Sequence, residues 1–83
     1  MTFEVVFEEK AINRMAGFLV DDPHGVERLF EAIDALAKEP RPAESFPYGS
    51  PDLRRLRLGR YRVLYEIRAN VISIGHVARR ASA

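Results

Sequence analysis

The chain has 83 residues, of which 47% are hydrophobic, and it contains no cysteine. A chain this short buries only about 60% of its unfolded surface, so we expect one domain over residues 1–83. The lack of cysteine excludes disulfides, a thiolate metal site and a cysteine nucleophile. The two histidines, His24 and His76, are far apart in the sequence, so we expect neither a metal site nor a cofactor. We find neither a signal peptide nor an apolar run of membrane length, and we expect a cytoplasmic protein with no membrane contact.

The net charge of +1 conceals a strong asymmetry between the two parts of the chain. Residues 1–50 carry five Lys or Arg and ten acids, a net charge of −5, whereas residues 51–83 carry eight Arg and two acids, a net charge of +6. Such a field suits binding to a polyanion or to an acidic protein segment. All eight cations are arginine, whose planar fork pairs with phosphate oxygens and stacks on bases, and this favours nucleic acid.

The first part of the chain predicts a strand and two helices. Residues 3–7 form a β-branched and aromatic run with Phe3, Val5 and Phe7 on one face. Apolar residues at helical spacing from Glu9 predict a helix that ends before Asp21. A second helix is expected with Asp22 as N-cap and Pro23 at its first position, and it ends before Pro40. Its apolar stripe comprises Val26, Leu29, Phe30, Ile33, Leu36 and Ala37.

Residues 40–51 contain four prolines and one glycine, so this segment is predicted to be a loop anchored by Phe46 and Tyr48. Three strands follow at residues 53–58, 61–67 and 71–75, separated by two tight turns, and residues 77–83 form a short tail. The order β-α-α-β-β-β predicts an α+β fold of two layers. In it, both helices pack on one face of a four-stranded, mainly antiparallel sheet and the other face stays open.

The alternation of side chains assigns the arginines to faces of this sheet. Apolar residues of the last three strands face the helices, which leaves Arg55, Arg57 and Arg62 on the open face. Arg54 falls near an edge and Arg60 in a turn. Parity places His76 on the helix side unless a bulge reorients it. An arginine row is also typical of a solvated or ion-paired surface, and this alternative stays open.

The stretch L-R-R-L-R-L-G-R-Y-R-V-L-Y-E-I, followed by V-I-S-I-G-H-V-A-R-R, resembles the RelE/ParE superfamily of toxins from bacterial type II toxin-antitoxin systems. The resemblance covers essentially the whole chain. It implies a RelE-like fold and a cognate antitoxin that wraps and neutralises the toxin, with oligomers formed only through the antitoxin complex. In the RelE branch it further implies a metal-independent mRNA interferase. Such an endoribonuclease cleaves mRNA in the ribosomal A site and uses the RNA 2′-hydroxyl as nucleophile.

Carried over by motif, Arg62 matches the family's catalytic arginine, and Arg55 matches a basic residue at the scissile phosphate. The resemblance places Arg57 at a basic backbone-contact position. Arg80 is expected to bind RNA, while Arg54 and Arg60 are expected to contact RNA or the ribosome at most. The tail H-V-A-R-R-A-S-A lacks the tyrosine of many relatives, and Val77 stands where they have an arginine, so Arg79 or Arg80 is expected to reach the phosphate instead.

His76 is the first candidate for proton transfer, because histidine titrates near neutrality. Glu44 is a weaker candidate base. Two alternatives remain: a ParE-like toxin that inhibits DNA gyrase without chemistry, and an inactive homologue that only binds antitoxin.

Overall fold

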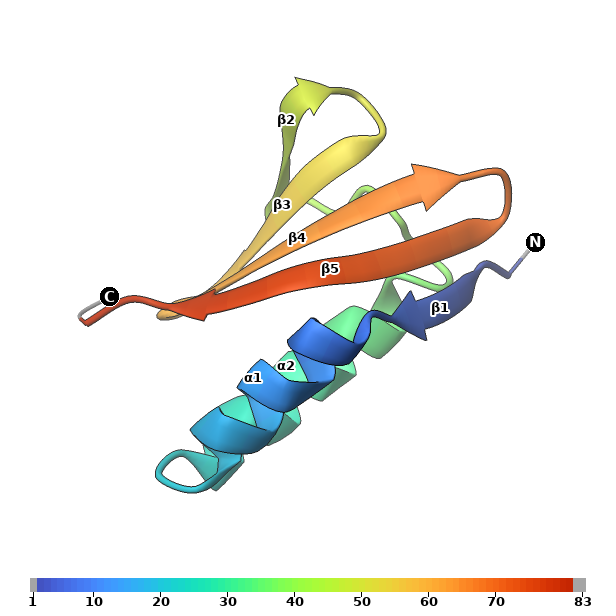
Figure 1. Cartoon of the computed structure of the whole chain (residues 1–83). Coiled ribbons are helices and arrows are strands. Elements are labelled where there is room, and N and C mark those ends of the chain that lie inside the picture. The colour runs from blue at the N-terminus through green and yellow to red at the C-terminus, as the bar shows by residue number, and fades with distance from the viewer. Residues whose placement is uncertain (1, 82–83) are drawn as a thin grey trace.

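The structure is a computed structural model, and it describes residues 2–81. Two helices lie side by side against one face of a twisted sheet, and the opposite face is open (Figure 1). This arrangement confirms the predicted two-layer α+β fold, but the sheet has five strands where four were expected. The elements are β1 (Glu4–Phe7), α1 (Glu9–Leu19), α2 (Pro23–Ala35), β2 (Ser45–Ser50), β3 (Leu53–Leu58), β4 (Tyr61–Arg68) and β5 (Val71–Arg79).

The strand order is β1-β5-β4-β3-β2. Strand β1 pairs in parallel with β5, and every other neighbouring pair is antiparallel. The two helices connect β1, at one edge of the sheet, to β2, at the other edge. β5, the last strand in the chain, lies between β1 and β4. Strands β3, β4 and β5 therefore form a continuous platform below which α1 and α2 pack (Figure 1).

The helices begin where the local signals predict, and α1 ends before Asp21, but α2 ends at Ala35, earlier than the predicted boundary before Pro40, so Leu36 and Ala37 lie in the turns that follow it. Asp22 caps α2, because its Oδ1 accepts a hydrogen bond from the backbone N–H of Gly25 at 3.1 Å, and Pro23 occupies the first helical position. The core lies between the helices and the sheet. Tyr61 and Tyr65 belong to it, and the Tyr65 hydroxyl donates to the carbonyl oxygen of Pro40 at 2.6 Å.

The fifth strand, β2, corrects the prediction of a loop over residues 40–51. Ser45, Phe46 and Pro47 pair with Leu56, Arg55 and Arg54 of β3, and the register then shifts before Ser50. β2 is an edge strand. Proline is tolerated there because, on the side that faces solvent, its missing N–H costs no hydrogen bond of the ladder. Gly49 has a φ of 88°, a conformation that glycine adopts readily, at the irregularity of the ladder.

The last strand extends to Arg79, whereas residues 77–83 were predicted to be a tail. Its ladder with β4 contains a bulge, because Tyr65 pairs with Ile74 but the adjacent Leu64 pairs with His76, so Gly75 has no partner. One extra residue reverses the alternation of every side chain that follows it. The prediction that His76 faces the helices is therefore wrong, and His76 lies exposed on the open face.

Val77, which parity would have placed outside, is fully buried in the core. Within the described residues 2–81, neither helix is long and apolar enough to span a membrane.

Candidate functional site

The eight arginines of the second part of the chain divide into two groups of four. The first group is engaged within the protein. Arg60 lies 3.9 Å from Asp22, and Arg68 lies 3.4 Å from Glu66. Arg79 pairs with Asp21 through two hydrogen bonds of 2.7 and 3.1 Å.

Arg54 is the fourth member of this first group, and it forms hydrogen bonds with Ser45 of β2 and with Pro51, which follows β2. Its Nε donates to the hydroxyl of Ser45 at 2.9 Å, and its terminal nitrogens donate to the carbonyl oxygens of Ser45 and Pro51. A guanidinium with these partners holds β2 against β3. Its first role is therefore to keep the edge strand in place.

The second group comprises Arg55, Arg57, Arg62 and Arg80. In the described part of the chain, none of the four forms a salt bridge with a carboxylate. Arg55 and Arg57 come from β3, Arg62 comes from β4, and Arg80 follows β5. All four lie on the open face of the sheet, where three of them were expected. We call these four residues the arginine cluster.

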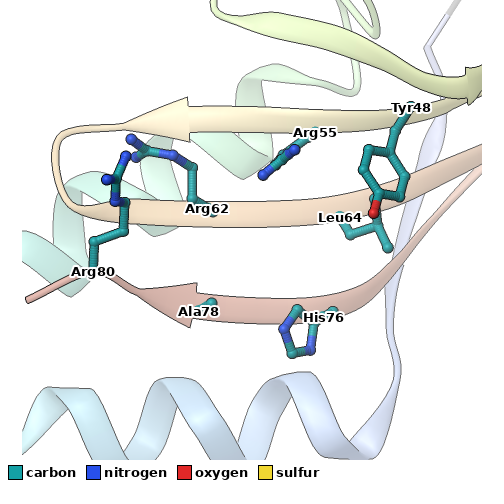
Figure 2. Close-up of a pocket in the computed structure, with 7 residues that line it drawn as sticks. All are labelled: Tyr48, Arg55, Arg62, Leu64, His76, Ala78 and Arg80. Atoms are coloured by element: carbon teal, nitrogen blue, oxygen red, sulfur yellow. The ribbon is translucent and has the colours of Figure 1, made fainter.

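The arginine cluster lines two neighbouring hollows. The larger one has a volume of about 360 Å³ and is lined by Tyr48, Arg55, Arg62, Leu64, His76, Ala78 and Arg80. Figure 2 shows Arg62 and Arg80 close together at the β3–β4 turn, Tyr48 and His76 toward the other end, and Arg55 between them. The smaller hollow, about 220 Å³, is lined by Phe46 and the whole arginine cluster. Four cations and a histidine thus surround one open surface.

The electrostatics of the arginine cluster centre on Arg62. Partial burial lowers the pKa of its guanidinium, and the positive charges of Arg57, Arg80 and Arg55 lower it further. The side chain is held in place by hydrogen bonds from one terminal nitrogen to the carbonyl oxygens of Gly59 and Tyr61, at 2.8 and 2.9 Å. A bound anion would relieve the repulsion among these cations, and the fixed guanidinium is ready to receive it.

Two aromatic rings border the arginine cluster, both from β2. The Arg55 guanidinium lies 5.1 Å from the centre of the Tyr48 ring, and that of Arg57 lies 5.6 Å from the Phe46 ring. The sequence identified both aromatics only as anchors of a loop. Their pattern F-P-Y alternates as in a strand, and this signal was outweighed by the surrounding prolines.

The structure separates the residues that were predicted to form a site. It brings Arg55, Arg57, Arg62, Arg80 and His76 together on one surface. Arg79 points to the helix side, where it pairs with Asp21 and lies 4.7 Å from the centre of the Phe18 ring. Arg54 and Arg60 also lie outside both hollows. Glu44 lines neither hollow and borders a separate pocket beside α2.

The site offers fixed cations and one histidine as its chemical groups. Guanidinium groups stabilise a phosphate that gains negative charge, and they do so without a metal. Histidine both accepts and donates protons near neutral pH. Among residues 2–81 there is no group of three or more His, Asp or Glu side chains placed to hold a metal ion. The arrangement thus suits binding and cleavage of a phosphodiester.

The sequence profile of a protein family, described as the ParE toxin of the type II toxin-antitoxin system parDE, matches residues 9–83. The chain belongs to this family of toxins. The family is part of the RelE/ParE superfamily, so the resemblance drawn from the arginine-rich hairpin is confirmed. No protein of curated function matches the sequence.

Solved structures of toxin-antitoxin complexes share the fold of this toxin. One is the archaeal RelE-RelB complex from Pyrococcus horikoshii, in which a chain is 29% identical with a TM-score of 0.77, and each chain is covered completely. Another is the RelBE2 complex from Mycobacterium tuberculosis, with 24% identity, a TM-score of 0.78 and coverage of 96% of this chain and 100% of the other. The chromosomal ParDE system of Pseudomonas aeruginosa gives 14% identity, a TM-score of 0.75 and coverage of 95% and 97%.

Proposed function

We propose that this toxin is an endoribonuclease that cleaves mRNA on the ribosome. The observation that carries the proposal is the open-face hollow in which His76 lies beside Arg55, Arg62 and Arg80. A toxin that acts only by binding another protein does not need a histidine among unpaired cations. Cleavage of a phosphodiester uses groups of both kinds, because cations stabilise the charged transition state and a histidine can transfer a proton. The proposed substrate places the activity in the cytoplasm.

In the proposed reaction the 2′-hydroxyl of the RNA gives up its proton to solvent water as its oxygen attacks the adjacent phosphorus, and the bond from phosphorus to the 5′-oxygen breaks. The products are a 2′,3′-cyclic phosphate and a 5′-hydroxyl end. Arg62 and Arg55 stabilise the extra negative charge of the transition state, and His76 donates the proton that the leaving 5′-oxygen requires. Arg57 holds a flanking phosphate. Of the two tail arginines, we propose that Arg80, and not Arg79, reaches the scissile phosphate.

We also propose a cognate antitoxin as the protein partner. The related structures include the RelE-RelB and ParDE systems, in which such a partner is present by name. A segment with acidic side chains would neutralise the four unpaired arginines. Covering the arginine cluster would then stop both RNA binding and cleavage.

The second candidate is inhibition of DNA gyrase without chemistry, in the manner of a ParE toxin. The family profile that matches the chain is the specific observation in its favour. In that case the arginine cluster would serve as a binding surface, and His76 would have no catalytic part.

The deciding experiment maps mRNA 5′ ends after induction of the toxin without antitoxin. We expect new 5′-hydroxyl ends with the wild type and none with Arg62→Ala. Arg68→Ala is the matched control, because Arg68 lies on the same strand but pairs with Glu66 at the far end of β4. Growth arrest with intact mRNA and inhibited gyrase would overturn the ribonuclease proposal. So would the absence of any growth effect, which would indicate an inactive homologue.

A further inference from the structure

Two large aromatic residues are exposed on the open face of the sheet. Phe46 is 47% exposed and Tyr48 is 50% exposed. The other exposed large hydrophobic side chains of the described chain lie on β1, on the helices and in the turn between them: Val6, Ile12, Leu19, Val20 and Phe30. Phe46 and Tyr48 are thus set apart by their position beside the arginine cluster.

The geometry of β2 presents the two rings in the same direction. Arg55 and Arg57 share the open face of β3, and the rings of Tyr48 and Phe46 lie against their guanidinium groups on that face. Each ring has a guanidinium on it, Arg57 at 5.6 Å from Phe46 and Arg55 at 5.1 Å from Tyr48. These cations fix the rings while about half of each side chain remains open to solvent. The result is a row of aromatic surfaces with phosphate-binding groups beside it.

The two rings are continuous with the two hollows. Tyr48 lines the larger hollow together with His76, and Phe46 lines the smaller one. Arg55, Arg62 and Arg80 line both hollows, so one strand of polyanion lying across the arginine cluster would pass both rings. Its bases would reach the rings while its phosphates meet the guanidinium groups.

We propose that Phe46 and Tyr48 form a base-stacking shelf for two unpaired nucleotides of an RNA strand bound at the arginine cluster. The inference rests on the proposed RNA substrate and names the groups that bind its bases. Single-stranded RNA is recognised by stacking of splayed bases on aromatic side chains, next to cations that follow the backbone. Stacking tolerates every base, because each has a π-face, so the shelf adds affinity and positions the strand without reading a fixed sequence.

The chain contains no tryptophan, so the fluorescence of one introduced tryptophan reports on its own surroundings alone. Tyr48→Trp places a single indole on the shelf, and Phe30→Trp places one at a similarly exposed site on α2, outside both hollows. The probe is an uncleavable 2′-O-methyl RNA of about ten nucleotides, within the usual site size of single-strand binders. We expect the probe to quench the indole fluorescence of Tyr48→Trp and to leave that of Phe30→Trp unchanged. Equal response of both variants, or of neither, would overturn the shelf.

Affinity measurements test the same point without a reporter. Tyr48→Ala and Phe46→Ala should each weaken binding of the 2′-O-methyl strand by about 5- to 150-fold, the loss expected for one base–aromatic stack. Tyr48→Phe keeps the ring and should bind as the wild type does. With an abasic strand, which keeps the phosphates, Tyr48→Ala should have no further effect. A loss of the same size on the abasic strand would show a structural role and would refute the proposal.

These outcomes are separable from the fate of the proposed ribonuclease. Quenching and base-dependent affinity in a protein that does not cleave mRNA would support the shelf and refute the enzyme. Cleavage that persists in Tyr48→Ala with unchanged RNA affinity would support the enzyme and refute the shelf. Quenching of the Tyr48→Trp variant by an antitoxin peptide but not by RNA would make these rings part of a protein interface, and this too would refute the shelf.

Discussion

The hydroxyl of Tyr61 donates a hydrogen bond to Oδ2 of Asp22 at 2.7 Å, and this contact ties β4 to the residue that caps α2. The other carboxylate oxygen of Asp22 accepts from the Gly25 N–H. One carboxylate therefore begins a helix and joins it to the sheet across 39 positions of the sequence. The bond from Tyr61, followed by that from Gly25, lowers the pKa of Asp22.

Removing the Tyr61 hydroxyl should destabilise the fold and leave the site intact. We expect Tyr61→Phe to lower the free energy of unfolding by about 1.5 kcal/mol, the lower end for a hydrogen bond to a charged group, because Asp22 keeps access to solvent. Urea unfolding at neutral pH measures this difference. Cleavage activity of the folded variant should match the wild type, since Tyr61 points away from the arginine cluster.

The same contact predicts how stability depends on pH. The pKa of Asp22 is lower in the folded protein than its ordinary value of 3.8, and so is that of Asp21, chiefly through its hydrogen bond with Arg79. A lowered carboxyl pKa contributes stability that is complete above the unfolded pKa and is lost as the pH falls through the folded pKa. Stability should therefore fall below about pH 4, and Asp22→Asn should show a shallower fall. Parallel profiles for the two proteins would contradict this assignment.

Arg79 and Arg80 are adjacent in the sequence, but Arg79 bonds to Asp21 on the helix side and Arg80 lines the two hollows on the open face. Alanine variants of the two residues can therefore be compared directly. Arg80→Ala removes a cation from the arginine cluster and should reduce cleavage by about 100-fold, as loss of one preorganised donor does. Arg79→Ala breaks the pair with Asp21 on the helix side and should leave cleavage unchanged while it lowers the melting temperature. Cleavage of a ribosome-bound mRNA by the two purified variants decides between them. The reverse result would return Arg79 to the site.

His76 is expected to act on the chemical step and not on binding. His76→Gln should reduce the single-turnover cleavage rate by about 100- to 10,000-fold, the usual contribution of a general acid. Affinity for an uncleavable RNA strand should change little, because the arginine cluster remains. A variant that binds RNA weakly but cleaves bound RNA at the wild-type rate would show that His76 contacts substrate without transferring a proton.

Arg54 is expected to hold the edge strand. Its guanidinium bonds to Ser45 and Pro51, so Arg54→Ala should release β2 from β3. Hydrogen exchange should then accelerate at the amides of β2 and not at those of β5. Lysine lacks the fork that reaches several acceptors at once, so Arg54→Lys should restore the protection of β2 only in part. Unchanged exchange in Arg54→Ala would show that backbone pairing alone is sufficient.

The sequence by itself determined the structural features that depend only on residues close together in the chain. Asp22 and Pro23 begin α2 by bonds and angles within one turn, and the two-residue period of β3 and β4 places Arg55, Arg57 and Arg62 on the open face. These features follow from local chemistry, so the two helices, the arginine-rich hairpin and its outward face were predictable.

Only the tertiary structure decided the rest, because it depends on contacts between distant parts of the chain. The bulge at Gly75, which turns His76 outward, exists in the pairing of β5 with β4 and not in β5 alone. The proline-containing β2 becomes a strand because β3 offers it an edge. Arg79 is withdrawn from the site by Asp21, which lies 58 positions away. Local periodicity identifies the arginines, but long-range pairing determines which of them stay free to bind a phosphate.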